Sequence, residues 1–337
     1  MKIRKLILPT LIIGILLGAT LLAFYLNTFN KSNITATKTV FISKNAPLES
    51  LESQVYPLLK SQKSFNFVAN AEKLPERIKP GRYTIKEGTT NKALVRMLAL
   101  GWETPMNLVL SGNIRNREKL ASILGSKLAA DSLEFATYLS TPATWKRYNL
   151  KEETFLSLFL PNTYEVKWTI TPEEFVERMF KEYEKFWNSE RIAKAKKLGL
   201  TSTEVSILAS IVCEESNHTP EMPSIAGVYI NRLKRGMKLD ADPTVKFAVG
   251  DPTIRRILYK HLEVDSPYNT YKNKGLPPGL ITIPSIIGID AVLNYKQHNY
   301  LYFCASPEFD GTHRFATTHA RHLVNARAYQ AALGRMR

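Results

Sequence analysis

The segment "ILASIVCEES", residues 207–216, has the pattern of a buried helix until two glutamates occur together in its last turn. At about 100° per residue, Leu208 and Ile211 lie on one apolar stripe. Glu215 falls within that stripe, whereas Glu214 points well away from it. A carboxylate on an apolar helix face loses hydration, which raises its pKa. The pattern therefore predicts a carboxyl group with unusual chemistry.

The position of Glu215 at a helix C-terminus acts in the same direction, because the partial negative charge there disfavours ionisation. Both effects favour a carboxylic acid that is still protonated near neutral pH. A general acid needs this property to protonate a poor leaving group such as a glycosidic oxygen. The alternative is structural: Glu215 marks the point where the helix reaches solvent, or it pairs with a cation such as Arg232.

The composition of the whole chain limits the classes of partner. At 337 residues the chain is long enough for two folded units. It carries 46 lysines and arginines against 30 acidic residues, a formal net charge of +16. This balance favours an anionic partner, which could be nucleic acid, an anionic bilayer or an acidic polymer.

The N-terminus has the pattern of a membrane anchor. Residues 1–5 supply three cations, and residues 6–26 then contain no charge, which as a helix spans about 31 Å, the thickness of a bilayer core. We predict a single-pass transmembrane helix with residues 1–5 in the cytoplasm and the rest of the chain outside. A cleaved signal peptide is the alternative, for which "ITATK" at 34–38 leaves room. An exported chain also argues against a nucleic-acid partner.

The expected fold class is α+β, with a single N-terminal transmembrane helix, a small α/β unit and a mixed α/β core. Residues 27–38 are polar without apolar periodicity and are predicted to form a short tether. Residues 39–103 alternate strand and helix patterns, which predicts the small unit. Residues 104–200 are predicted to be a mostly helical connecting region, and residues 201–337 contain the densest group of chemically active side chains.

The cysteines and histidines form no metal or redox motif. Cys213 and Cys304 could pair in an oxidising compartment or pack as small apolar groups, and both interpretations stay open. His313, His319 and His322 lie near one another in the sequence, but without a firm ligand spacing. We therefore expect no metal and no cofactor.

Three segments after Glu215 combine amide, hydroxyl, carboxyl and aromatic side chains. They are "EMPSIAGVYINRL", "DADPTVKFAVGD" and "SPYNTYKNKGLPPGL". A sugar site uses this mixture, because amides and hydroxyls hydrogen-bond to sugar hydroxyls and aromatic faces pack against pyranose rings. Each segment taken alone is more often structural, since "GLPPG" and "DP" commonly form turns.

Four motifs together resemble one known family. "ILASIVCEES", "GVYINRLKRGMKLDADPTVKFAVG", "SPYNTYKNKGLPPGLI" and "HRFATTHARH" resemble, in this order over about residues 205–329, the YceG-like family of endolytic murein transglycosylases, called MltG. "KPGRYTI" and "FLPNTYEV" extend the resemblance more weakly. It implies one N-terminal anchor, a small LysM-like unit beside the membrane at residues 39–103, and a catalytic domain that faces the cell wall.

The resemblance also implies an activity and a set of site residues. The activity is lytic cleavage of the β-1,4 bond between MurNAc and GlcNAc in peptidoglycan strands. The family's catalytic glutamate, the second acid of an E-x-E pair, falls on Glu215. The position of the first acid of that pair is occupied by Cys213 in this sequence. The other positions that match family motifs, which we treat as expected substrate-binding residues of the cleft, are Glu221, Asn231, Asp242, Thr244, Tyr268, Asn269 and Tyr271. The departures from the family pattern are Asn162, Leu280, Arg321 and Leu323.

In the implied mechanism Glu215 serves first as general acid and then as general base. It protonates the bridging oxygen and afterwards takes a proton from the MurNAc C6 hydroxyl, which closes a 1,6-anhydro ring without water. Two alternatives stay open: a muramidase that uses water, with Glu221, Asp240 or Asp242 as base, and a wall-binding scaffold without catalysis. The expected partners are peptidoglycan strands and the bilayer, which residues 6–26 would span. Cell-wall synthases are a further option, and no nucleic-acid partner is expected. The expected location is the cell (inner) membrane, with the catalytic domain on the extracytoplasmic side.

Overall fold

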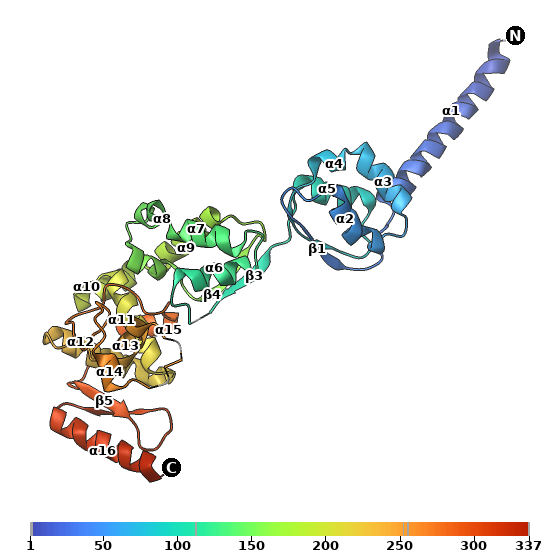
Figure 1. Ribbon diagram of the computed structural model, residues 1–337. Coiled ribbons are helices and arrows are strands. Elements are labelled where there is room, and N and C mark those ends of the chain that lie inside the picture. Colours follow the sequence, from blue (N-terminus) through green and yellow to red (C-terminus); the bar gives the residue numbers. More distant parts are fainter. Residues whose placement is uncertain (1–2, 112, 252, 255, 336–337) are drawn as a thin grey trace. The chain divides into compact units, whose positions relative to one another are not determined.

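The structure is a computed structural model that describes residues 3–111, 113–251, 253–254 and 256–335. It mixes helices with short strands and begins with one apolar helix (Figure 1), as the sequence predicts. The chain forms two compact units. The N-terminal unit reaches to Leu108 and includes residues 127–129 and 165–170, and the C-terminal unit contains residues 109–126, 130–164 and 171–337.

Helix α1, Ile3–Tyr25, corresponds to the uncharged run of the sequence. A short π-helix, η1 (Leu26–Asn30), continues it. Within the described part of the chain, one helical segment is long and apolar enough to cross a membrane, at Leu11–Asn30 with a mean hydropathy of 2.0. Its side chains from Leu11 to Leu26 are exposed. Near its end, Phe24 meets the ring of Phe67 with centroids 5.4 Å apart.

Residues 27–38 differ from the predicted tether, because the stretch from residue 28 to residue 34 packs into the N-terminal unit. Asn33 and Ile34 are buried. The side-chain amide of Asn33 donates to Asn91 Oδ1 at 2.7 Å, and the amide of Asn91 donates to the carbonyl of Thr28 at 2.9 Å. Polar residues near an anchor suggest solvent exposure, but here they find hydrogen-bond partners in the folded unit. The end of the apolar helix is therefore fixed to this unit.

The N-terminal unit pairs two antiparallel strands, with Lys38 opposite Ile85 and Ile42 opposite Gly81. Val40, Tyr83 and Leu94 are among the side chains of its fully buried core. The elements of this unit after η1 are β1 (Lys38–Ile42), α2 (Leu48–Val55), η2 (Tyr56–Leu58), α3 (Gln62–Ala71), α4 (Leu74–Arg77), β2 (Gly81–Ile85) and α5 (Asn91–Leu100). The N-terminal unit thus combines helices with one strand pair, while its LysM-like character stays a prediction.

The predicted connecting region, residues 104–200, is not a separate body. Most of it belongs to the same compact unit as the predicted catalytic core. Its elements are β3 (Met106–Leu110), α6 (Arg117–Gly125), α7 (Ser132–Ser140), α8 (Pro142–Arg147), η3 (Glu152–Leu158), β4 (Asn162–Val166), α9 (Pro172–Phe186) and α10 (Ser189–Leu198), with β3 paired to β4. The sequence pattern predicts one long helix for the last two. The chain breaks it at Asn188, whose side chain caps α10 by accepting from the backbone of Arg191.

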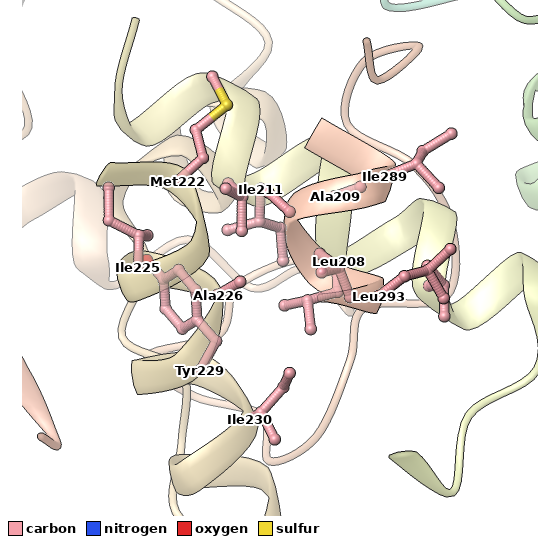
Figure 2. Close-up of a cluster of buried hydrophobic side chains, with 14 of the residues drawn as sticks. Leu208, Ala209, Ile211, Met222, Ile225, Ala226, Tyr229, Ile230, Ile289 and Leu293 are labelled. Carbon is pink, nitrogen blue, oxygen red and sulfur yellow. The ribbon is translucent and has the colours of Figure 1, made fainter. Parts of the chain in front are cut away.

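The C-terminal half of this unit contains the remaining elements: α11 (Ser202–Glu215), η4 (Thr219–Glu221), α12 (Met222–Lys234), α13 (Asp242–Val249), α14 (Tyr259–Leu262), α15 (Ile286–Leu293), β5 (Tyr302–Ala305), β6 (His313–Ala316) and α16 (His319–Arg335). Strands β5 and β6 form an antiparallel pair, with Cys304 opposite Arg314. Helix α11 lies at the centre and contacts α10, α12, α13 and α15. Figure 2 shows its Leu208 and Ile211 among the apolar side chains of α12 and α15.

Candidate active site

Helix α11 delivers Glu215 to the site as its last residue. The helix begins with the predicted capping box, in which the Thr201 side chain accepts from the backbone of Glu204 and the Glu204 carboxylate accepts from the backbone of Thr201. Every residue from Val205 to Val212 is buried. The helix ends because Ser216 is extended, with φ −150°. A buried helix that stops at this point holds its final carboxyl group on the border between core and surface.

The two glutamates of the last turn have different partners. Glu214 forms an ion pair with Arg115 at 2.5 Å. Glu215 accepts a hydrogen bond of 2.5 Å from the Tyr229 hydroxyl on α12. Its side chain is partly buried, so it does not extend freely into solvent, and the ion pair of Arg232 is made with Asp240 at 2.8 Å. Neither structural alternative for Glu215 describes its surroundings.

The surroundings of Glu215 raise its pKa from 4.5 to about 7. Loss of hydration on burial is the largest cause. The Tyr229 hydrogen bond opposes it by favouring the charged form, the negative charge of Asp242 raises the pKa further, and the positive charge of Arg232 lowers it. Near neutral pH a substantial share of Glu215 is therefore the neutral acid, which is the form that can donate a proton.

An open cavity of about 460 Å³ lies over Glu215. Its lining combines carboxyl, guanidinium, imidazole and aromatic groups, which suits a polar ligand with apolar ring faces. The residues that line it are Glu215, Tyr229, Arg232, Leu239, Asp240, Asp242, Tyr271, Tyr302, Phe303, Cys304, Ala305, His313, His319 and His322. Three of the predicted site residues, Glu215, Asp242 and Tyr271, are among them.

A second open cavity, of about 590 Å³, adjoins the first. The two share Glu215, Ala305 and His313 in their linings. Ser216, Asn217 and Phe309 also line the second cavity. Glu215 therefore borders both cavities.

Asp242 and Tyr271 form one side of the first cavity. The Tyr271 hydroxyl donates to Asp242 Oδ1 at 2.6 Å. Burial and the hydrogen bond to the Asp242 carboxylate raise the pKa of Tyr271 well above its usual value. Thr244 and Asn269 lie behind them and are fully buried. Asn269 accepts from the backbone of Tyr271 at 3.0 Å, so it holds the loop that carries this tyrosine.

The other predicted residues lie outside the lining of the first cavity. Thr244 donates to the carbonyl of Ala241 at 2.7 Å. Tyr268 packs against Phe247, with ring centroids 4.7 Å apart. The Asn231 amide donates to the carbonyl of His298 at 2.7 Å and to that of Tyr300 at 3.0 Å, which fixes the segment before β5.

Glu221 contacts a neighbour that the sequence did not suggest. Its Oε1 accepts from the backbone N–H of His313 at 3.0 Å, and its Oε2 lies 2.9 Å from Nδ1 of the same residue. Tyr229 and His313 are the two important site residues that sequence patterns missed. Tyr229 falls on the apolar face of α12, where an aromatic residue looks like core, and His313 was considered only as a metal ligand.

The departures from the family pattern lie outside the first cavity. Cys213 is a free thiol whose Sγ lies 3.5 Å from Ser285 Oγ. Cys304, which is not one of the departures, is also a free thiol and lines the first cavity. Burial raises the pKa of Cys213. Of the remaining departures, Asn162 begins β4 and Leu280 is buried. Arg321 and Leu323 lie on α16, and both are exposed. Among the described residues, no group of three histidine, cysteine or acidic side chains could hold a metal ion.

The fold and the site define a mixed α/β protein with a glutamate of raised pKa that lines an open cavity. The sequence model of the YceG-like family matches residues 40–328, and the chain belongs to this family. The crystal structure of the yceG-like protein lmo1499 from Listeria monocytogenes has a similar fold, with a TM-score of 0.55 and 26% sequence identity. The similarity covers 86% of this chain and 99% of that chain.

Two curated relatives carry the name endolytic murein transglycosylase. The protein of Bacillus subtilis (strain 168) is 38% identical over 133 residues, which is 40% of this chain and 36% of that protein. The protein of Streptococcus pneumoniae serotype 2 (strain D39 / NCTC 7466) is 33% identical over 163 residues, 47% of this chain and 28% of that protein. The matched segments thus span about a third of these relatives.

Proposed function

We propose that this chain is a lytic transglycosylase of peptidoglycan that cleaves the β-1,4 bond between MurNAc and GlcNAc within glycan strands. The observation that carries the proposal is Glu215, a carboxylic acid with a pKa of about 7 at the base of an open polar groove. Membership in the YceG-like family and the names of its relatives support the same activity.

The reaction uses Glu215 twice. The neutral acid protonates the bridging oxygen while the bond to the MurNAc C1 lengthens toward an oxocarbenium-like state. The resulting carboxylate then accepts the proton of the MurNAc C6 hydroxyl, and the C6 oxygen bonds to C1. The products are a 1,6-anhydro end and a free GlcNAc hydroxyl, and the proton balance of Glu215 is restored. The Tyr229 hydroxyl stabilises the carboxylate between the two steps.

The carboxylates near Glu215 favour this reaction over hydrolysis. A water-using muramidase needs a second carboxylate free to act as a base. Asp240 is paired with Arg232, Asp242 accepts from Tyr271, and Glu221 is bonded to His313. Each of the three residues considered as a base is thus already engaged by a neighbouring side chain, which lowers its availability to a water molecule.

The residues predicted to bind substrate divide into three groups. Asp242 and Tyr271 line the cavity and contact the glycan directly. Thr244 and Asn269 are fully buried and keep the loop of Tyr271 in place. The others, Glu221, Asn231 and Tyr268, act through the neighbours that they hold. The two adjoining cavities that share Glu215 support cleavage within a glycan strand.

The chain acts at a membrane in this proposal. Helix α1 serves as the single-pass anchor, with the N-terminal cations in the cytoplasm and both folded units outside, next to the cell wall. The fixed junction through Asn33 and Asn91 keeps the N-terminal unit at the membrane surface. The net charge of +16 adds attraction to anionic lipid or wall polymers. Cell-wall synthases are suitable partners there.

Digestion of purified sacculi by the full-length protein in detergent micelles tests the function. Mass analysis of the soluble products should find 1,6-anhydroMurNAc ends with the wild type and almost none with Glu215→Gln. Glu214→Gln is the matched control, because it removes the neighbouring charge and should keep most of the turnover. Reducing MurNAc ends would identify a muramidase, and binding to sacculi without product release would identify a scaffold.

A further inference from the structure

His313 lies where the two cavities of the site meet. It is the first residue of β6, and it lines both cavities together with Glu215 and Ala305. A glycan strand that is bound over Glu215 therefore also passes His313. The His313 imidazole takes no part in the two proton transfers proposed for Glu215.

Glu221 fixes the His313 imidazole in one orientation and one tautomer. It holds both the backbone N–H, at 3.0 Å, and the ring Nδ1, at 2.9 Å, although the two residues are 92 positions apart in the chain. The exposed fractions of the two side chains are 13% and 16%. A carboxylate can only accept, so Nδ1 carries the hydrogen in this pair and the neutral ring leaves Nε2 as an acceptor.

The ring plane is held as well. Phe303 on β5 meets the imidazole edge to face, with centroids 5.3 Å apart and planes at 90°. Within the part of the chain that the structure describes, Glu221 is the hydrogen-bond partner of the ring and it engages the Nδ1 side alone. An acceptor that is oriented by a charged partner, packed by an aromatic ring and placed beside the acid has the features of a built binding group.

We propose that His313 contacts the glycan directly, with Nε2 accepting a hydrogen bond from a hydroxyl or amide N–H of the sugar beside the scissile bond. Glu221 is then a positioning residue for His313. The inference rests on the proposed function and deepens it, because it names a second contact at the point of cleavage. A structural alternative exists, in which the pair only ties β6 to the start of α12.

Two substitutions of His313 separate these roles because each keeps one end of the imidazole. Asparagine reproduces the Nδ1 end, so it keeps the bond to Glu221 and removes the acceptor over the groove. Glutamine reproduces the reach to Nε2, so its carbonyl keeps the acceptor, while the side-chain bond to Glu221 is lost and the backbone bond stays. If His313 contacts the glycan, His313→Asn should be the less active variant. If the pair with Glu221 only joins β6 to the start of α12, His313→Gln should be the less active one.

The measurement is kcat/KM for release of 1,6-anhydro ends from sacculi by full-length protein in micelles. We expect a loss of at least about tenfold for His313→Asn, the value of one substrate hydrogen bond of about 1.4 kcal/mol, and a smaller loss for His313→Gln. Glu221→Gln, which keeps an acceptor for Nδ1, should retain more activity than Glu221→Ala. His313→Asn within threefold of wild type, or equal losses for Asn and Gln, would overturn the assignment.

A measurement on the unsubstituted histidine covers the case in which a variant does not fold. We expect the Glu215→Gln variant to bind the glycan without turnover. In this background, ¹⁵N-histidine NMR should show the Nε2 resonance of His313 shift on addition of a GlcNAc–MurNAc tetrasaccharide, while Nδ1 changes little. No shift at saturating ligand would refute the contact. Wild type that releases no anhydro ends refutes the proposed function itself, whereas active wild type with an active His313→Asn refutes only this inference.

Discussion

Replacing Glu215 by glutamine should stabilise the C-terminal unit at pH 8 and leave its stability nearly unchanged at pH 4. The folded state raises the pKa of Glu215 from 4.5 to about 7. Below pH 4.5 the group is protonated in both the folded and the unfolded chain. Between pH 4.5 and 7 the unfolded chain gives up this proton and the folded chain keeps it, so the stability contributed by the group decreases as pH rises. Above pH 7 nothing further is lost.

The size of the effect follows from the pKa rise. Each pKa unit corresponds to about 1.4 kcal/mol, so the rise to about 7 corresponds to about 3 kcal/mol. This is an upper limit because the side chain is partly exposed to solvent. Glutamine has no charge at any pH and its carbonyl can still accept from Tyr229. The variant should therefore gain up to about 3 kcal/mol over wild type between pH 4 and pH 8.

Chemical denaturation of full-length protein in micelles at pH 4, 6 and 8 measures this difference. The buried Trp145 and Trp187 report on the C-terminal unit. Glu214→Gln is the matched control, because it breaks the ion pair with Arg115 and should lower the stability at pH 8. If the free-energy difference between Glu215→Gln and wild type were the same at pH 4 and pH 8, Glu215 would not be a dehydrated acid, and the reasoning would fail.

Three further changes have defined outcomes. Tyr229→Phe removes the hydrogen bond that favours the charged form of Glu215, so the alkaline limb of the pH–activity profile should move up by about one pH unit. Asp242→Asn removes a charge that raises the same pKa, so the limb should move to lower pH, as initial rates of anhydro-end release from pH 5 to 9 would show. Gly288→Ala should cost about 1–3 kcal/mol in denaturant unfolding, because a Cβ would lie 2.2 Å from Cys213 Sγ; an unchanged midpoint would contradict it.

Local patterns in the sequence predicted the elements that depend on neighbours along the chain. The capping box at Thr201 and the apolar positions of α11 were sufficient to place Glu215 at the end of a buried helix. The segment "YLYFCAS", residues 300–306, likewise has the apolar pattern of a strand, and β5 lies within it. These features follow from periodicity and from hydrogen bonds over three or four residues, which a single sequence contains.

The contacts that complete the site depend on residues far apart in the chain. Glu221 and His313 are 92 positions apart, and no periodicity links them. Tyr229 has the spacing of a core residue, and only the packing of α12 against α11 turns its hydroxyl toward Glu215. The tether prediction failed for the same reason, because the hydrogen bond between Asn33 and Asn91 joins residues 58 positions apart.

The same limit explains why sequence reasoning predicted only half of the electrostatics of Glu215. Burial raises its pKa and was foreseen from the helix pattern, whereas the Tyr229 hydroxyl and the Arg232 charge, which lower it, come from another helix. A group that must donate a proton and then accept one works best when its pKa is near the ambient pH. A carboxylic acid whose pKa is raised by burial alone would be protonated at neutral pH but would release its proton poorly, because its carboxylate is too costly to form. An ordinary glutamate would instead be ionised before it met the substrate. The opposed contributions keep the pKa at about 7, where neither the donation nor the acceptance of the proton is strongly unfavourable near neutral pH.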